Sequence, residues 1–426
     1  MMQDEHVVIV GGGFGGINLA GELAGKGGVR VTLVDRNNYN FFQPLLYQVA
    51  TGQLEVSSIA LPFRTILKGS RNVRFRLGEL VRVDPEARVV HLSTGTLEYD
   101  YLVLATGTET NFFGMDSVEE DALPMKTLEE GLALRNHLLR KTEEATFAAT
   151  PDERARLLTV VISGAGPTGV ELAGMLAEMR RDLLEKIYPE LDRGEVEVVL
   201  VDAAPSVLPP MRDASQRYTL DVLSRMGVGV LLNTRVEGYR DGAVQLADGS
   251  SIPTATLIWA AGVRGRAIDG IPRSSYGRGE RLRVDAFGQV AGVPDVFAIG
   301  DASLQTSDDR FPHGHPQLAS VAAQQGRHLA VNLLARVHGE PLRPFRYVDR
   351  GSMAIIGRSK AAADLTVPRR SVTGWAAWAM WLFVHLFQLI GYRNRLSTMW
   401  DWTTAYFMRD RSLGMILRAA EGDRMS

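Results

Sequence analysis

Two short glycine patterns are the parts of this 426-residue chain best suited to bind a phosphate group. Each has the spacing GxGxxG after an apolar, β-branched run, at Gly11, Gly13 and Gly16 and at Gly164, Gly166 and Gly169. Glycines let the backbone approach a pyrophosphate, and the N-terminus of the helix that follows stabilises its charge. The alternative is a glycine-rich turn without a ligand. With a strand before and a helix after each pattern, the sequence predicts two dinucleotide sites.

A carboxylate ends the next predicted strand after each pattern. VRVTLVD ends at Asp35, 24 positions after Gly11, and EVEVVLVD ends at Asp202, 38 positions after Gly164. An acid near the first spacing accepts hydrogen bonds from ribose hydroxyls, and the longer second spacing fits a longer helix. Asp35 suits the adenosine ribose of FAD. Asp202 favours NADH over NADPH, because it would repel a 2′-phosphate, although a nearby base would weaken that preference.

Few other ionisable residues are placed for chemistry. Glu171 follows the third glycine of the second pattern by two positions, where the first pattern has Asn18. We expect Glu171 on the first helical turn, either as an acid stabilised by the helix dipole or facing the nicotinamide and relaying protons. Lys360 is a candidate for holding an oxygen atom of a bound ligand, with a solvated loop lysine as the alternative.

The composition excludes several kinds of chemistry. The chain has no cysteine, which excludes thiol catalysis, cysteine-ligated zinc and iron–sulfur clusters. The net charge of −2 gives no general attraction to nucleic acid. His313 and His315 have no third metal ligand in view, so we predict a plain loop and no metal. Any redox cofactor that this chain binds must therefore act on its electron acceptor without help from a cysteine.

The order of the remaining motifs resembles the two-dinucleotide-binding flavoprotein superfamily. YDYLVLATGT contains Thr106 and Gly107, TLIWAAGV contains Gly262, and VPDVFAIGDAS contains Gly300 and Asp301. The resemblance implies an α/β fold with two Rossmann-like domains, the NADH-binding one inserted into the FAD-binding one. The expected boundaries are 1–120 and 280–345 for the FAD domain, 121–279 for the NADH domain, and 346–426 for a C-terminal membrane-associating region.

Three longer stretches narrow the resemblance to type II NADH:quinone oxidoreductases. They are FFQPLLYQVATGQLEVSSIALPFRTIL (41–67), GPTGVELAGMLAEM (166–179) and HPQLASVAAQQGRHLAVNLL (315–334). The resemblance implies FAD, NADH and a membrane quinone as ligands, and no proton pumping. This sequence departs from the family where an Ala-Gln pair is common, since it has Ala319-Ser320. A quinone contact at position 320 is therefore in doubt, and Gln324 is the remaining candidate for contacting the quinone.

The predicted site residues follow from these motifs. The predicted catalytic residues are Glu171, Gln324 and Lys360. The apolar stretch around Pro44, Tyr47 and Gln48 is expected to line the flavin, with core packing as the alternative. The other predicted FAD contacts are Gly11, Gly13, Phe14, Gly15, Gly16, Asp35, Arg36, Thr106, Gly107, Gly300 and Asp301. The predicted NADH contacts are Gly164, Gly166, Pro167, Thr168, Gly169, Asp202 and Gly262.

A charge-free stretch of 19 residues, 374–392, lies near the C-terminus between pairs of arginines, Arg369–Arg370 and Arg393 with Arg395. A spanning helix, a buried or dimer-forming helix, and a helix pair lying in the membrane surface are all compatible with it. Trp375, Trp378 and Trp381 are expected to share roughly one helical face. Tryptophan and flanking arginine favour the interfacial interpretation, which also agrees with the monotopic attachment that the resemblance implies. We therefore expect a peripheral protein on the cytoplasmic face of the inner membrane, with a homodimer possible.

Two rival functions remain open at this stage. A soluble NADH-dependent reductase that passes single electrons to a ferredoxin shares the fold and needs no cysteine, but it has no use for an apolar tail. A flavin-bound redox sensor is a rival of another kind, and the two intact glycine patterns argue against it.

Overall fold

The computed structural model describes residues 4–407 and 415–416, and these form two compact units. Both are assembled from separate segments of the chain. The first unit contains residues 1–41, 60–109 and 263–349, and the second contains 42–59, 110–262 and 350–426. These bounds describe packing. The expected ligand-binding domains at 1–120, 121–279, 280–345 and 346–426 stay a prediction.

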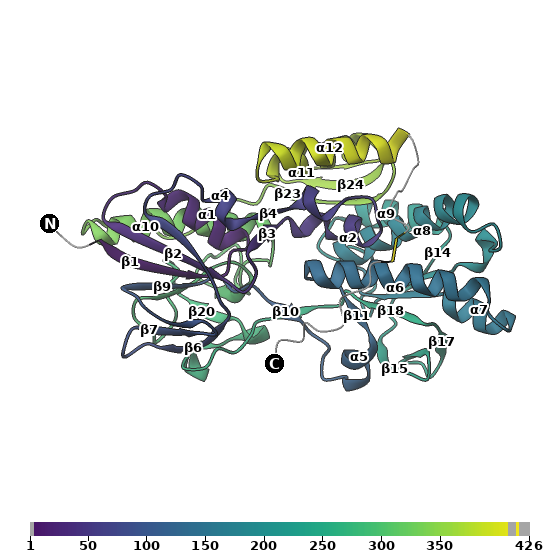
Figure 1. Ribbon diagram of the computed structural model, residues 1–426, viewed down its shortest axis with the longest axis horizontal. Coiled ribbons are helices and arrows are strands. Elements are labelled where there is room, and N and C mark those ends of the chain that lie inside the picture. Colours follow the sequence, from purple (N-terminus) through teal and green to yellow (C-terminus); the bar gives the residue numbers. More distant parts are fainter. Residues whose placement is uncertain (1–3, 408–414, 417–426) are drawn as a thin grey trace. The chain divides into compact units, whose positions relative to one another are not determined.

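The first unit is built on a five-stranded parallel sheet (Figure 1). Its strands, in spatial order, are β21 (Val296–Ala298), β9 (Tyr101–Leu104), β1 (Glu5–Val10), β2 (Val29–Asp35) and β5 (Val73–Leu77). The helices α1 (Phe14–Leu23) and α10 (Ala319–Val337) pack against each other. A residue with a Cβ at Gly326 of α10 would place that atom 2.3 Å from the Gly15 carbonyl oxygen. The two helix backbones therefore meet more closely than any other residue type allows.

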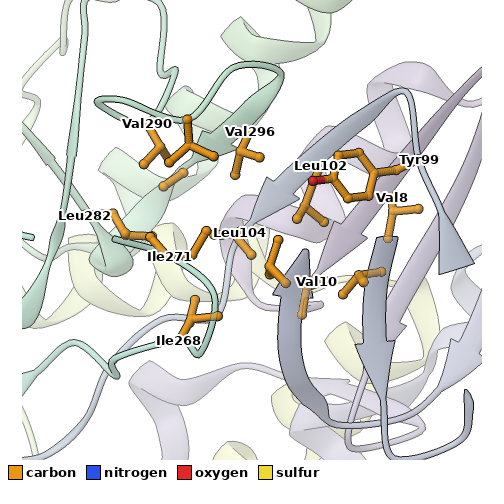
Figure 2. Packing of buried hydrophobic residues seen from close by; sticks show 14 of the residues in the cluster. Val8, Val10, Tyr99, Leu102, Leu104, Ile268, Ile271, Leu282, Val290 and Val296 are labelled. Atoms are coloured by element: carbon orange, nitrogen blue, oxygen red, sulfur yellow. The ribbon is translucent and has the colours of Figure 1, made fainter. Parts of the chain in front are cut away.

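Smaller sheets complete the first unit. Antiparallel strands form one three-stranded sheet, β6 (Leu80–Asp84), β7 (Val89–Leu92) and β8 (Gly95–Glu98). Two pairs of short strands add to it, β3 (Tyr39–Phe41) with β4 (Ala60–Pro62) and β20 (Leu282–Val284) with β22 (Ser303–Gln305). Figure 2 shows a core in which Val8 and Val10 of β1 and Leu102 and Leu104 of β9 face apolar residues of the segment 263–349. Burial of these side chains ties segments that are distant in sequence into one unit.

The second unit repeats the design of the first. Its five-stranded parallel sheet has the order β11 (Leu123–Pro124), β18 (Thr256–Trp259), β12 (Val160–Ser163), β13 (Val198–Val201) and β14 (Val228–Leu231). The run VVIS in β12 is buried throughout, as expected for a parallel strand covered on both faces. The helices of this unit include α6 (Leu128–Thr146), α7 (Pro151–Leu158), α8 (Pro167–Ile187) and α9 (Asp213–Arg225).

The C-terminal part of the second unit is a three-stranded antiparallel sheet covered by helices. The strands are β23 (Gly351–Gly357), β24 (Lys360–Leu365) and β25 (Arg370–Thr373), followed by α11 (Trp375–Gln388) and α12 (Tyr392–Phe407), drawn in yellow and yellow-green in Figure 1. Helix α8 packs against β23 so closely that a Cβ at Gly174 would lie 1.7 Å from the Ile356 carbonyl oxygen. The short helices α2 (Leu46–Ala50) and α3 (Val56–Ile59) also belong to this unit.

The expectation that three tryptophans of α11 share one face was wrong. The side chain of Trp375 is 66% exposed, whereas that of Trp381 is fully buried. Each step of three residues falls about 60° short of a full helical turn, so two steps separate the outer tryptophans by about 120°. Among residues 4–407 and 415–416, no helix combines the length and apolar character that crossing a bilayer requires.

Candidate active site

The first glycine loop has the geometry that a dinucleotide needs. Gly11 follows β1 with φ +105°, and a Cβ there would lie 2.2 Å from the carbonyl oxygen of Ala105. A Cβ at Gly16 would lie 1.8 Å from the Gly11 carbonyl oxygen, so neither position accepts a side chain. At Gly13, the N-cap of α1, a Cβ would meet no atom within 4 Å. The loop is closed on its inner side and open at the helix N-terminus, where a pyrophosphate would bind.

Asp35 ends β2 and contacts this loop, in the place that the sequence predicted. One carboxylate oxygen accepts from the Gly12 N–H at 2.7 Å, and the other accepts from the Asn37 N–H at 2.8 Å. Burial raises the pKa of Asp35, and these two hydrogen bonds act in the opposite direction. The neighbouring Arg36 is exposed. Asp35 therefore ties the glycine loop to the end of β2, while its contact with ribose stays a prediction.

Of the other predicted residues of the first unit, Phe14 and Gly15 begin α1, and the rest lie at the ends of strands or on α10. Thr106 and Gly107 follow β9, and Gly300 and Asp301 form a tight turn after β21. The Gly300 N–H donates to the side-chain oxygen of Gln325 at 2.7 Å. Gln325 was not predicted from the sequence. It is buried, and only its position next to Gln324 could have indicated a role in the site. It positions the turn that carries Asp301.

The side chain of Gln324 is engaged with the backbone. Its amide nitrogen donates to the Val348 carbonyl at 3.0 Å, and its oxygen accepts from the Val348 N–H at 3.0 Å. Ser320, which stands where the resemblance led us to expect a glutamine, shares a hydrogen bond of 2.9 Å with the Tyr347 hydroxyl. The predicted quinone contact of Gln324 is untested by this geometry and stays a prediction.

His315 is a structural residue of the loop before α10. Its Nε2 lies 3.2 Å from an oxygen of Asp308, and both side chains are buried. Hydrogen bonds from Arg310 are the main cause that lowers the pKa of Asp308, and burial lowers the pKa of His315. In the described part of the chain, no three or more His, Asp or Glu side chains are grouped as a metal site would require.

The second glycine loop repeats the close backbone contacts of the first. Gly164 has φ +110°, and a Cβ there would lie 2.7 Å from the Ala260 carbonyl carbon; a Cβ at Gly169 would lie 1.8 Å from the Gly164 oxygen. Gly166 is the N-cap of α8, with nothing within 4 Å of an added Cβ. Asp202, just after β13, accepts from the Ala165 N–H at 2.5 Å and the Ala204 N–H at 2.7 Å. Pro167 and Thr168 begin α8. The geometry of the whole loop therefore fits a second dinucleotide.

Gly262 lies in the exposed loop after β18, with φ +90°. A Cβ at this position would lie 2.7 Å from the Phe113 ring, so the glycine lets the ring pack against the backbone. A direct contact between Gly262 and NADH stays a prediction.

Glu171 is the most unusual ionisable residue of the second unit. It is the fifth residue of α8, beyond the first turn, so the expectation of a first-turn acid was wrong. Its side chain is 8% exposed, and one oxygen accepts from the Ile355 N–H of β23 at 3.4 Å. Burial raises the pKa of Glu171 to about 8, against a smaller opposite effect of that N–H and the Trp381 indole. Glu171 is therefore mostly protonated at neutral pH and can give or take a proton near pH 8.

Tyr47 and Gln48 are buried on α2, which packs against α8. The Gln48 amide nitrogen donates to the Tyr47 hydroxyl oxygen at 3.0 Å, and the Trp402 indole N–H donates to the Gln48 oxygen at 2.8 Å. Burial, and next the charge of Glu171, raise the pKa of Tyr47. Pro44 is half-buried in the turn before α2. Both buried residues thus form part of a polar chain that reaches α12.

The strand β23 and the turn after it contact a second glutamate of α8. Glu178, one heptad after Glu171, is buried and accepts from the Arg358 N–H at 2.5 Å. Lys360 begins β24 directly after this turn and pairs with Gly357. It therefore lies at the end of the hairpin that Glu178 contacts, whereas Glu171 contacts Ile355. Its predicted catalytic role remains untested.

Helix α11 covers Glu171 with aromatic rings. Trp381 stacks on His385 with a distance of 4.0 Å between ring centroids, and His385 meets Phe42 edge to face at 6.1 Å. Burial lowers the pKa of His385 to about 4, so this histidine is neutral at physiological pH. On the α11 side, Glu171 therefore faces aromatic rings and a neutral histidine, in surroundings that raise its pKa to about 8.

Two parallel-sheet units with matching glycine loops define a flavoprotein of the two-dinucleotide kind, and comparisons with known proteins agree. The family model described as pyridine nucleotide-disulphide oxidoreductase matches residues 5–326, and the NDH2 C-terminal domain matches residues 350–410. The chain is 34% identical over 421 residues to the type II NADH:quinone oxidoreductase Ndh of Mycobacterium tuberculosis, covering 95% of this chain and 89% of the relative. It is 37% identical over 423 residues to NdhA of the same organism, covering 95% and 88%.

A solved structure has the same fold. The structure of NDH2 from Plasmodium falciparum in complex with NADH superposes with a TM-score of 0.88 at 20% identity, covering 95% of this chain and 99% of that one. The present chain belongs to the type II NADH:quinone oxidoreductases.

Proposed function

We propose that this protein uses FAD to transfer two electrons from NADH to a membrane quinone, without pumping protons. The observation that carries the proposal is the presence of two complete dinucleotide loops in a chain without cysteine. FAD, when bound at the first loop, would supply the redox chemistry that links the nicotinamide to the quinone. The protein supplies the two binding loops, an apolar environment and a buried carboxyl group.

The two loops have different ligands in this proposal. The first, with Asp35, holds FAD, and the second, with Asp202, receives NADH. The Asp202 carboxylate is held by two backbone N–H groups at the end of β13, where the adenosine ribose of a bound dinucleotide would lie. A 2′-phosphate there would meet a negative charge, which supports NADH over NADPH.

We further propose that Glu171 exchanges protons during turnover. Quinone reduction consumes two protons, and a carboxyl group with a pKa of about 8 is half-protonated close to the operating pH. Gln324 and Lys360 remain proposed contacts of the quinone or flavin oxygens. Glu171 and Gln324 lie in stretches that carry the resemblance, and the burial of Glu171 adds physical support for its role.

We infer attachment to the membrane surface through α11 and α12. Large apolar side chains of these helices are exposed, among them Trp375, Phe383, Phe387, Leu396, Met399 and Trp400. An exposed apolar face of this kind, flanked by Arg369, Arg370, Arg393 and Arg395, suits a bilayer interface, where arginines meet lipid phosphates. Attachment on the cytoplasmic face of the inner membrane would admit a lipid-soluble quinone without passage through water. The same apolar face also suits a homodimer contact.

The decisive experiment is anaerobic rapid mixing of the holoprotein with NADH and then with a soluble quinone. We expect the flavin absorbance to bleach with NADH and to recover with quinone. Bleaching without recovery would refute quinone reduction and favour the ferredoxin-type reductase. Absence of bleaching would favour a flavin-bound sensor.

A second experiment tests the membrane proposal through partitioning to vesicles of anionic phospholipid. Truncation after Val372 removes both helices, and exchange of Phe383 and Phe387 for serine removes two exposed rings while keeping α11. Both variants should lose vesicle binding. Retained binding in both would exclude α11 and α12 as the attachment surface, and a change from dimer to monomer without loss of binding would assign the face to a homodimer.

A further inference from the structure

The residue between the first two glycines of the pattern differs between the two loops. It is Gly12 in the first unit and Ala165 in the second. The backbone N–H of this residue is held in the same way in both, by Asp35 at 2.7 Å and by Asp202 at 2.5 Å. The φ angle of Gly12 lies outside the left-handed region, so this angle does not require a glycine. The reason for a glycine at position 12 therefore lies outside the loop.

The ring of Phe63 occupies the place that a side chain at position 12 would take. A Cβ at Gly12 would lie 2.1 Å from Cζ, 2.4 Å from Cε1 and 3.1 Å from Cε2 of this ring, and these three are the atoms nearest to it. Phe63 begins the short helix α4 (Phe63–Ile66) and is 1% exposed. A distant part of the chain thus fills this place in the first loop, whereas the second loop has the methyl group of Ala165.

The position of the Phe63 ring is fixed by its own partners. The ring stacks on Phe75 of β5, with 4.9 Å between the ring centroids, and the Arg64 guanidinium lies 5.6 Å from the centroid of the Phe75 ring. The Phe63 N–H donates to the Asn38 carbonyl at 2.9 Å, beside the paired strands β3 and β4. The ring therefore cannot move away from the loop without disturbing packed neighbours.

The strand β3 supplies a second contact with Gly12. The side-chain amide nitrogen of Asn40 donates to the Gly12 carbonyl at 2.8 Å. In the second loop, the Ala165 carbonyl accepts instead from the Leu208 backbone N–H at 2.8 Å. The polar contacts of this residue are thus matched in the two loops. The difference that remains is an aromatic ring from outside the first loop against a methyl group within the second.

Three glycines in a row give the run 11–13 more backbone freedom than the run Gly164-Ala165-Gly166 has. A loop that must be ordered when its ligand binds loses affinity, whereas a loop that is already fixed does not. We propose that Phe63 is a positioning residue for FAD, whose ring fixes the glycine run in the conformation that holds the pyrophosphate and thereby slows the release of the flavin. The proposal rests on the proposed assignment of FAD to the first loop.

The substitution Phe63→Leu tests the proposal because it keeps a buried apolar side chain and removes the Cε and Cζ atoms that exclude a Cβ at position 12. It should speed FAD release by about fivefold, the effect of one glycine that gains backbone freedom. Gly12→Ala alone should speed release by about tenfold, because its methyl group overpacks against the ring. The double variant rebuilds the first loop like the second, so its release rate should return to within about twofold of the unaltered rate.

The release rate is measured from the rise of FAD fluorescence after dilution of the holoprotein, at a temperature well below unfolding. Phe75→Leu is the matched control, because it shortens the stacked ring, whose atoms are not the ones nearest to a Cβ at Gly12. We expect that Phe75→Leu does not restore FAD retention in Gly12→Ala, and that NADH binding is unchanged in all variants. If Gly12→Ala does not fold alone, recovery of folded, FAD-loaded protein by Phe63→Leu is the rescue that the proposal expects.

Three outcomes would overturn the proposal. They are an unchanged release rate in Phe63→Leu, a double variant in which the two single effects multiply, and an equal rescue of Gly12→Ala by Phe75→Leu. A different result separates the proposed function from this proposal. If the variants at positions 12 and 63 change NADH binding and leave FAD release unaltered, the assignment of FAD to the first loop fails, while rescue in the double variant, read by NADH titration, still decides whether Phe63 positions the loop.

Discussion

The two glycine loops are alike where they approach a dinucleotide and unlike one helical turn later. In both, the first glycine has a positive φ, the third packs on the first, and an aspartate from the next strand end accepts the N–H of the residue after the first glycine. Two positions after the third glycine, however, the first unit has Asn18 and the second has Glu171. The shared part is fixed by the geometry of a phosphate, whereas the position beyond it is free to differ.

The packing partner of each helix explains the difference. Asn18 is half-buried on α1, donates to the Phe14 carbonyl at 2.8 Å and accepts from the Arg327 side chain of α10 at 2.5 Å. Glu171 instead faces β23 and the aromatic residues of α11, and one of its oxygens accepts from the Ile355 N–H at 3.4 Å. Asn18 therefore lies against a polar side chain and stays half-buried. Glu171 lies against apolar and aromatic groups, which raise the pKa of its carboxyl group.

The largest expected effect comes from placing a methyl group where the loops are open. Gly13→Ala and Gly166→Ala introduce a Cβ that meets no protein atom, in extended backbone that alanine adopts readily. Stability should therefore hardly change. The methyl group occupies the space of the pyrophosphate, and a loss of about 2–3 kcal/mol corresponds to roughly 30- to 150-fold weaker binding.

The two variants are controls for each other. Gly166→Ala should weaken NADH binding with full FAD content, and Gly13→Ala should lower FAD content, measured by flavin absorbance and by NADH titration. If both variants affect the same ligand, the assignment of one loop to each dinucleotide is wrong.

The next effect concerns Glu171. Because its folded pKa of about 8 lies above the usual value of 4.5, the folded state holds an additional proton between these pH values. The stability that this group contributes is fully present below about pH 4.5 and is lost as pH rises to about 8, by at most about 1.4 kcal/mol per pH unit. Glu171→Gln cannot ionise, so its free energy of unfolding should depend less on pH across that range. Denaturant unfolding at a series of pH values measures it, with Glu190→Gln as an exposed control; identical slopes in all three proteins would place the raised pKa elsewhere.

The sequence was informative about the loops because their chemistry is local. The positions of Asp35 and Asp202 followed from an apolar strand ending in an acid, and both residues contact the loops that their spacing indicated. Gln48 and Trp402, in contrast, lie 354 positions apart, and no local pattern pairs them. Gln325 and Trp381 were missed as site residues for the same reason, since their environments depend on the packing of α10 and α11. For Glu171 the motif predicted an acid on the first helical turn, stabilised by the helix dipole or facing the nicotinamide, whereas the structure places it beyond that turn and buried against β23.

A smaller effect is expected from Asp202→Ser. Removing the carboxylate removes the repulsion of a 2′-phosphate, so the ratio of kcat/KM for NADPH to that for NADH should rise by about tenfold, or about 1.4 kcal/mol. The Asp202 carboxylate also accepts from the backbone N–H groups of Ala165 and Ala204. Its loss should therefore lower kcat/KM somewhat for both cofactors. Asp202→Asn keeps an oxygen acceptor for the Ala165 N–H and removes the charge, and it separates the two effects. An unchanged ratio in both variants would remove Asp202 as the basis of cofactor preference.

The smallest expected effect comes from giving the first loop the residue of the second. In Asn18→Glu the new carboxylate lies beside Arg327 and remains half-exposed, so it should be ionised at neutral pH and create no infrared carboxylic band that titrates near pH 8. Its negative charge near the helix N-terminus that binds the pyrophosphate should weaken FAD binding by only about threefold, because solvent and Arg327 screen it. FAD fluorescence on equilibrium dilution measures the change, with Asn18→Gln as the uncharged control of the same length. If Asn18→Glu did titrate near pH 8, the apolar contact with β23 and α11 would not be what raises the pKa of Glu171, and the difference between the loops would have to come from the loops themselves.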